Sequence, residues 1–295
     1  MEQRLLLVIN PVSGDGAAKR WTYDMIEILS KKYPFITVFL SSGVNDIKNT
    51  VAANASKFDA IVCCGGDGTL NETLEGIVKS GADTKLGYLP MGTVNDFANS
   101  HGISKNLNIT LSRIVEAVPR EYDVGTLGER VFSYVAAFGA FTDVAYQTPQ
   151  EAKSAFGKLA YISEAAKRLS SLRPIKMTFY ADDRCMTDEF IYGMVSNSKT
   201  VGGIRFFDEK TDEFLCDGLI EVTLVKHLDD AVVLSKAVTA LLNPKVEYEG
   251  VVKLKTSRIS FSFDEKVPFT VDGEFGGEYT DVEASVIPRG IKIMA

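Results

Sequence analysis

Along the first hundred residues, short apolar runs alternate with segments whose apolar residues have helical spacing, and this alternation limits the fold to very few classes. The four apolar runs are residues 4–9, 35–40, 60–64 and 86–89. The helical segments that follow them are expected at residues 17–31, through Ile47 and Val51, from Thr69 and from Thr93. Such an alternation predicts an α/β domain whose parallel sheet is covered by helices on both faces.

After about Tyr122 the pattern changes to the period-two alternation of half-buried strands. This alternation is clear in four segments: residues 176–180, 219–225, 258–263 and 267–271. We therefore expect a mainly antiparallel β-sandwich as a second domain, with one helix at 154–172. The expected domains are 1–122, joined by a returning strand within 287–295, and 123–286.

Composition and charge exclude several classes of protein. Of the 295 residues, 45% are hydrophobic and 24% are charged, the ordinary balance of a globular protein. A net charge of −7 argues against a general nucleic-acid partner. No apolar stretch reaches the roughly 18 residues of a membrane span, and the apolar run at 5–9 is too short for a signal peptide, so we expect a cytoplasmic protein. The four cysteines are expected to be buried, reduced thiols.

The strongest motif is Gly-Gly-Asp-Gly-Thr-Leu-Asn-Glu at residues 65–72, between an apolar run and a helix. Its glycines allow backbone amides to approach a phosphate, and the helix N-terminus adds partial positive charge. The chain has no Walker A sequence, and Asn71 replaces the last glycine of a dinucleotide-binding loop. The alternative interpretation is a helix capping box formed by Thr69 and Glu72, which is compatible with a phosphate site.

A second loop, residues 90–98, has the same design, with Gly92 followed by Thr93 as the expected helix cap and Asp96 three residues later. By itself this segment is equally consistent with a structural turn. Residues 10–14, Asn-Pro-Val-Ser-Gly, form a weaker signal because such sequences are common in plain turns.

Together with a late Val-Asp-Gly-Glu at residues 271–274, these three loops resemble the diacylglycerol kinase catalytic-domain family of soluble bacterial lipid kinases. The motifs occur in family order across nearly the whole chain. The resemblance implies an NAD kinase/phosphofructokinase-like nucleotide domain, a β-sandwich lipid-substrate domain, and ATP and lipid meeting between them. It also implies a protein that contacts the inner face of the membrane transiently and often forms a homodimer.

The resemblance also assigns roles to residues. It implies that ATP contacts Asn10, Pro11, Val12, Ser13, Gly14, Ser41, Gly66, Asp67, Gly68, Thr69, Leu70, Asn71, Glu72 and Thr93. Asp67, Asp96 and Asp123 resemble the acidic cluster that organises Mg²⁺, Glu274 resembles the general base, and Asp272 accompanies it. A structural Mg²⁺ site is implied at Asp217, with carbonyl groups near Phe214 and Leu219, although Asp-Gly is also a common turn dipeptide.

Departures from the family pattern and alternative functions remain open at this stage. Asp15 stands where the family often has a basic residue, and Ser41 replaces a commoner threonine. The basic side of residues 153–173 suits either solvent or an anionic membrane surface. An NAD kinase shares the first phosphate loop, and a regulatory nucleotide-binding protein without turnover is a third reading. Nothing in the sequence identifies the lipid.

Overall fold

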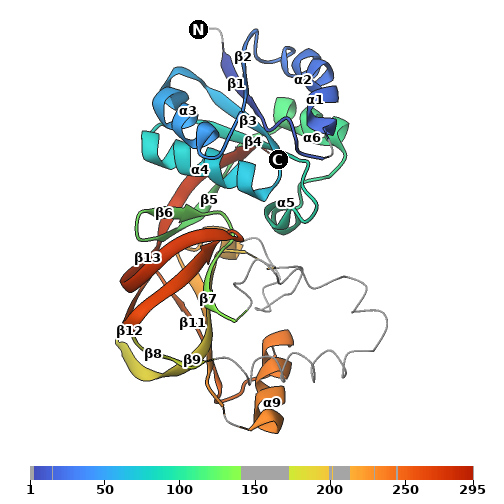
Figure 1. Cartoon of the computed structure of the whole chain (residues 1–295). Coiled ribbons are helices and arrows are strands. Elements are labelled where there is room, and N and C mark those ends of the chain that lie inside the picture. Colours follow the sequence, from blue (N-terminus) through green and yellow to red (C-terminus); the bar gives the residue numbers. More distant parts are fainter. Residues whose placement is uncertain are drawn as a thin grey trace.

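The computed structural model describes residues 3–14, 16–140, 173–198, 201, 213–228, 230–243 and 245–294. Figure 1 shows an α/β domain at one end of an elongated molecule and a β-rich domain at the other. The fold class predicted from the sequence is confirmed, while the helix expected at 154–172 lies outside the described residues.

The N-terminal domain is built on a parallel sheet in the order β4-β3-β1-β2. Its strands are β1 (Arg4–Ile9), β2 (Phe35–Leu40), β3 (Ala60–Gly65) and β4 (Lys85–Pro90). Alternate residues of β1 and β3 pack into two different apolar clusters, so both faces of the sheet are buried.

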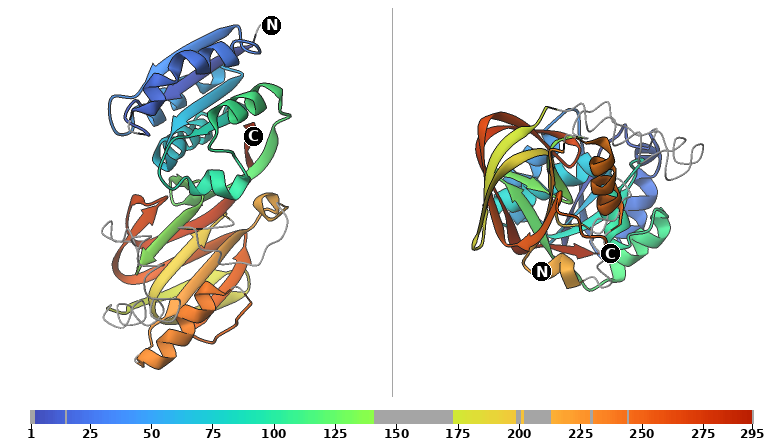
Figure 2. Two further views of the ribbon diagram at one scale, coloured as in Figure 1. Left: turned by 90° about the vertical axis from the view of Figure 1, so that its right-hand side faces the viewer. Right: turned by 90° about the horizontal axis from the view of Figure 1, so that it is seen from below.

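Helices cover the two faces of this sheet (Figures 1 and 2). One face packs against α3 (Asp46–Asn54) and α4 (Asp67–Ser80). The other packs against α2 (Thr22–Leu29) and α6 (Leu107–Glu116), and the shorter pieces of the domain are α1 (Ala17–Arg20), η1 (Ala55–Lys57) and α5 (Asp96–His101). The carboxyl ends of the strands, and the loops that follow them, lie on the side that faces the β-rich domain.

The C-terminal part is mainly antiparallel β. Its elements are β5 (Arg120–Leu127), β6 (Arg130–Phe132), β7 (Val135–Gly139), β8 (Ile175–Ala181), β9 (Arg184–Ser196), η2 (Glu213–Cys216), β10 (Ile220–Lys226), α9 (Ala231–Leu242), β11 (Val251–Thr256), β12 (Arg258–Val271) and β13 (Glu274–Met294). The core contains a cluster of aromatic rings whose centroids lie 5.0–6.4 Å apart: Phe138, Phe261, Phe263 and Phe269. No described helix is long and apolar enough to span a bilayer.

Strand β13 connects the two domains. It pairs with β12 and β5 in antiparallel fashion, and its last residues, Lys292–Met294, pair in parallel with β4 of the N-terminal sheet. The pairing with β5 is interrupted between Ile287 and Ile291, where Arg289 adopts a φ of 51°. A single strand therefore belongs to both sheets and kinks where it passes from one to the other.

Several predicted boundaries are wrong. Helix α4 begins at Asp67, before the predicted Thr69, and α5 begins at Asp96, after the predicted Thr93. The segment 17–31 forms two helices rather than one, and 258–271 is one strand with an irregularity in its pairing after Ser262. Cys63 and Cys64 are buried as predicted, but Cys185 and Cys216 are exposed because they lie near a strand start and a turn.

Candidate active site

A cleft of about 540 Å³ lies at the carboxyl ends of β1, β2 and β3, where parallel sheets bind ligands. The residues predicted to contact ATP that line it are Asn10, Pro11, Val12, Ser13, Ser41, Gly66, Gly68, Thr69 and Glu72. Glu274, which is the first residue of β13, lines the same cleft. Segments separated by more than two hundred residues in the sequence thus meet at one site.

The first two glycine loops touch each other through their backbones. A Cβ on Gly92 would lie 2.8 Å from the Cα of Gly66, so a side chain at this position would force the loops apart. Asn10 joins the loop at 10–14 to the loop at 65–72 by donating from Nδ2 to Thr69 Oγ1, 3.3 Å away. Because Gly66 is the N-cap of α4 in an extended conformation, the free amides of the first helical turn lie next to the cleft. This arrangement suits phosphate oxygens.

Glu72 caps a neighbouring helix, so the capping-box interpretation of Thr69 and Glu72 is wrong. Glu72 Oε1 accepts from the backbone amide of Asn45 at 3.0 Å, and Oε2 accepts from that of Lys48 at 3.3 Å. These two amides belong to the N-cap and the first turn of α3. Because α4 begins two residues before Thr69, Glu72 lies past the first turn of α4 and beside the N-terminus of α3.

The second loop is organised by Asn95 rather than by Thr93. Asn95 adopts a left-handed conformation with a φ of 55°, and its Oδ1 accepts from Tyr88 Oη at 3.1 Å and from the Gly92 amide at 2.9 Å. Thr93 is exposed and is not the helix cap. The buried amide of Asn95 holds this loop closed.

Five residues predicted to contact ATP are not among those that line the cleft. They are Gly14, Asp67, Leu70, Asn71 and Thr93. Leu70 is fully buried in the apolar core beneath α4, and Asn71 donates to Val131 O and to Asp272 Oδ2. Asn71 therefore joins α4 to the β-rich domain.

Asp67, between two glycines of the cleft wall, has a buried oxygen that no group in the described part of the chain satisfies. Its Oδ1 has no hydrogen-bond partner there, whereas Oδ2 accepts from the amide of Asp96 at 3.3 Å. Burial, followed by the negative charge of Asp96, raises the pKa of Asp67 to about 6, and Asp272 adds to the effect. A buried carboxylate oxygen amid surplus negative charge fits a hard cation such as Mg²⁺.

Asp272 is a fully engaged carboxylate. It accepts hydrogen bonds of 2.7–3.1 Å from Asn71 Nδ2, from the amide and hydroxyl of Ser133, and from the amides of Tyr134 and Val135. Burial raises its pKa, and these donors oppose the rise by stabilising the charged form. With its oxygens occupied by these donors, Asp272 holds the turn at 272–275 in place. Its catalytic role stays a prediction.

Glu274 differs from Asp272 because its side chain is exposed and extends toward the phosphate loop. A Cβ on Gly68 would lie 2.7 Å from Glu274 Oε1, so the carboxylate rests against this glycine. Asp272 and Gly273, with φ of 50° and 84°, form the left-handed turn that brings it there.

Asp123 and Asp217 lie near one another and apart from the contacts that join Asp67, Asp96 and Asp272. Asp123 Oδ2 accepts from the Gly218 amide at 2.6 Å, and Oδ1 accepts from the Arg289 amide at 2.7 Å. Asp217 Oδ1 accepts from the amide of Leu219 at 3.0 Å, which is an Asx turn. Within the described residues, no three His, Cys, Asp or Glu side chains form a metal-binding set. The metal roles of Asp123, Asp217, Phe214 and Leu219 stay predictions.

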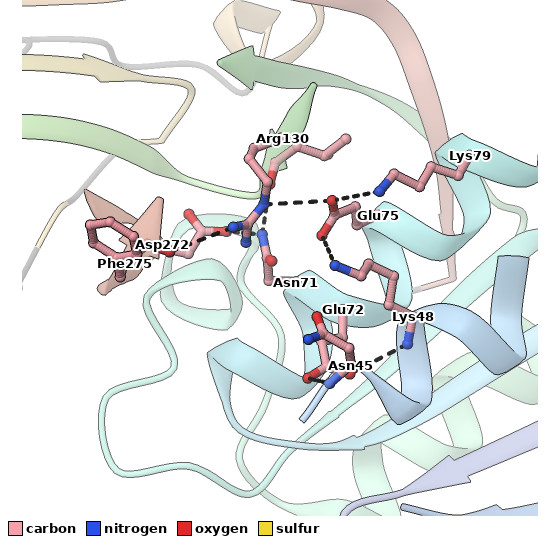
Figure 3. Close-up of polar contacts among 10 residues, drawn as sticks. Asn45, Lys48, Asn71, Glu72, Glu75, Lys79, Arg130, Asp272 and Phe275 are labelled. Carbon is pink, nitrogen blue, oxygen red and sulfur yellow. Dashed lines mark hydrogen bonds and ion pairs between the residues drawn. The ribbon is translucent and has the colours of Figure 1, made fainter. Parts of the chain in front are cut away.

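Several residues of the site were not predicted from the sequence. Ser42, Gly43, Val44 and Ile47 also line the cleft. Tyr134 is buried beside the acids, whose charges add to the effect of burial in raising its pKa, and its hydroxyl lies near Gly273. Glu75, Arg130 and Lys48 form a buried ionic cluster next to the turn (Figure 3). No motif marks these residues; only their contacts with distant segments reveal them.

A parallel-sheet domain with glycine-rich phosphate loops, together with a β-rich domain that adds a carboxylate to the same cleft, defines a two-domain kinase. Residues 4–127 match the diacylglycerol kinase catalytic domain, and residues 135–295 match the YegS C-terminal NAD kinase beta sandwich-like domain. The chain belongs to the diacylglycerol kinase catalytic-domain family and carries the YegS type of C-terminal domain.

Relatives of this chain include proteins named diacylglycerol kinase. That of Bacillus subtilis is 27% identical over 93% of this chain and 91% of its own length, and that of Staphylococcus saprophyticus is 28% identical over 94% and 91%. A crystal structure of a diacylglycerol kinase from Bacillus anthracis aligns with a TM-score of 0.75 at 19% identity, covering 99% of this chain and 96% of the other. This structural likeness shows the shared fold.

Proposed function

We propose that the chain is a magnesium-dependent lipid kinase that transfers the γ-phosphate of ATP to a lipid hydroxyl, with diacylglycerol as the acceptor and phosphatidic acid as the product. The observation that carries this proposal is the position of Glu274, which reaches the wall of the phosphate cleft from the other domain and rests on Gly68. A carboxylate at this place can accept the proton that a hydroxyl loses as it attacks a bound γ-phosphate.

In the proposed complex, the phosphates of ATP lie at the N-terminus of α4. The free amides of the first turn of α4 would bind the phosphates, since a helix N-terminus attracts negative charge. Val12 and Val44, whose side chains are 78% and 83% exposed, line the same cleft and offer apolar surface to the adenine ring.

In the proposed reaction the lipid hydroxyl oxygen forms a bond to the γ-phosphorus while the bond from this phosphorus to the β,γ-bridging oxygen breaks, which releases ADP. Glu274 accepts the hydroxyl proton. Asp67 would hold Mg²⁺ through its unpartnered oxygen, with phosphate oxygens and water completing the coordination, and the bound ion would neutralise phosphate charge. Asp96, beside Asp67, adds negative charge that favours the cation.

The test is transfer of labelled γ-phosphate from ATP, with Mg²⁺, to a panel of lipids in mixed micelles, with NAD as a separate acceptor. We expect labelled phosphatidic acid from the wild type and at least a hundredfold loss of turnover in Glu274→Gln, with ATP binding within about twofold of normal. Asp67→Asn should lose magnesium-dependent activity.

The outcomes separate the proposal from its competitors. A different labelled lipid would change the acceptor and keep the mechanism, and labelled NADP would make the chain an NAD kinase. ATP binding without any transfer would support a regulatory nucleotide-binding protein. Equal loss of ATP binding and turnover in Glu274→Gln would remove its role as base. The acceptor lipid also implies transient contact with the inner face of the membrane, which a vesicle co-sedimentation assay would check.

A further inference from the structure

Three contacts join helix α4 to residues 272–275, which we call the base turn because it carries Glu274. The Glu274 carboxylate rests on Gly68. Asn71 Nδ2 donates to Asp272 Oδ2 at 2.7 Å. Glu75 Oε1 forms an ion pair with Arg130 Nε at 3.5 Å, and Arg130 Nη1 donates to the carbonyl oxygen of Phe275 at 3.5 Å (Figure 3).

The three helix positions share one face. Residues 68, 71 and 75 are spaced by three and then four residues, which aligns their side chains along one side of an α-helix. This helix begins at the glycine-rich loop, so one rigid element adjoins the phosphate site, contacts Asp272 directly and reaches Phe275 through Arg130. The base turn therefore takes its position from the same helix that receives the phosphates.

The ionic cluster around Glu75 explains how the last contact is fixed. The Glu75 side chain is 1% exposed and lies within 3.5 Å of Lys48 Nζ, 3.1 Å of Lys79 Nζ and 3.5 Å of Arg130 Nε. A buried carboxylate held by three cations has little freedom to move. The guanidinium of Arg130 is planar, so it can pair with Glu75 through Nε while Nη1 reaches the Phe275 carbonyl, a geometry that lysine lacks.

We propose that Arg130, anchored by Glu75, is a positioning residue that sets the placement of Glu274 against the phosphate site. This inference rests on the proposed function, because it assumes that Glu274 takes the proton of the acceptor. Arg130 itself is not among the residues that line the cleft. It acts through the backbone of the base turn.

The kinetic test compares Arg130→Gln with Lys79→Gln. Each change removes one cation from the Glu75 carboxylate, but Lys79 belongs to α4 itself. We expect Arg130→Gln to lower kcat about tenfold or more while KM for ATP stays within about twofold, because only the base is displaced. Lys79→Gln should retain kcat within about twofold, and Arg130→Lys should not rescue. In a Glu274→Gln background, Arg130→Gln should cause little further loss. Equal losses in the two backgrounds, or a parallel loss in Lys79→Gln, would overturn the proposal.

A second measurement does not depend on the substrate. Amide hydrogen exchange in a peptide that covers residues 272–276 should be faster in Arg130→Gln than in the wild type and unchanged in Lys79→Gln. If the wild type transfers phosphate to no lipid, the proposed function fails while this comparison still tests the contact. Unchanged exchange in Arg130→Gln would overturn the inference, and faster exchange with normal kcat would remove the role in catalysis.

Discussion

Carboxylates of the same chemical type do different work in this protein because their surroundings differ. Asp272 is enclosed by donors and fixes a turn, whereas Asp67, nearby, has a buried oxygen without a partner and suits a cation. Glu75 is buried among three cations, and Glu274 is exposed in the cleft. The number of donors around each carboxylate, rather than its place in a motif, decides which one is available for chemistry.

Glu221 provides a prediction about pH at this scale. Its side chain is fully buried and lies 3.4 Å from Lys255 Nζ. Burial raises the pKa of Glu221 to about 8, although Lys255 opposes the rise. Between pH 4.5 and 8 the folded state therefore retains a proton that the unfolded state releases, so this residue makes the folded state less stable as pH increases.

We expect Glu221→Gln to remove this dependence. Between pH 5.5 and pH 8.5, the free energy of unfolding of the variant should increase by a few kcal/mol relative to that of the wild type. Urea denaturation of both proteins at several pH values gives the comparison. Parallel curves would show that Glu221 is already ionised in the folded protein at pH 5.5.

At the scale of helices and strands, the sequence predicted what local patterning controls. Apolar runs identified β1, β3 and β4 because these strands are buried along nearly their whole length. The run at 35–40 identified β2 as well, although several of its apolar side chains are exposed. The start of α4 was misplaced because the extended Gly66 precedes it and touches the second loop. The start of α5 was misplaced because the left-handed Asn95 precedes it, held by Tyr88 of β4 and by Gly92 of its own loop. Three motifs meet at one cleft, but Arg130 and Tyr134 escaped notice since their partners lie more than fifty residues away.

The close contact between α3 and α4 gives a prediction at this scale. A Cβ on Gly76 would lie 2.7 Å from Val51 Cβ and 2.8 Å from the carbonyl oxygen of Lys48. We expect Gly76→Ala to push the helices apart and to lower the free energy of unfolding by about 1–3 kcal/mol, despite the better helix propensity of alanine. Chemical denaturation measures the loss. Gly43→Ala, which would meet no atom within 4 Å, is the control, and an equal loss there would contradict the packing argument.

For the whole molecule, the decisive connection is the paired stretch of β5 and β13 that runs between the domains (Figure 1). Asp123 of β5 accepts from the backbone of Arg289 in the kink of β13 and from Gly218 of the β-rich domain. One carboxylate thus fixes the junction at which the two sheets change direction.

We therefore expect Asp123→Asn to lower the free energy of unfolding by about 1–3 kcal/mol, because one backbone amide loses its acceptor in a buried place. Thermal unfolding and a magnesium titration of phosphate transfer should be measured on the same preparation. A lower Tm with an unchanged magnesium requirement agrees with a role at the junction. A stable variant with an altered magnesium requirement would instead place Asp123 in the acidic cluster.

The path of β13 has a consequence for how the chain is made. The sheet that begins with β1 gains the strand beside β4 only from residues 292–294, which are made after all the residues of the β-rich domain that precede them. Until then, the edge of β4 on that side lacks this neighbour, and an uncovered strand edge is a site where a nascent chain can pair wrongly. The α/β domain is therefore completed only after the residues of the β-rich domain have been made.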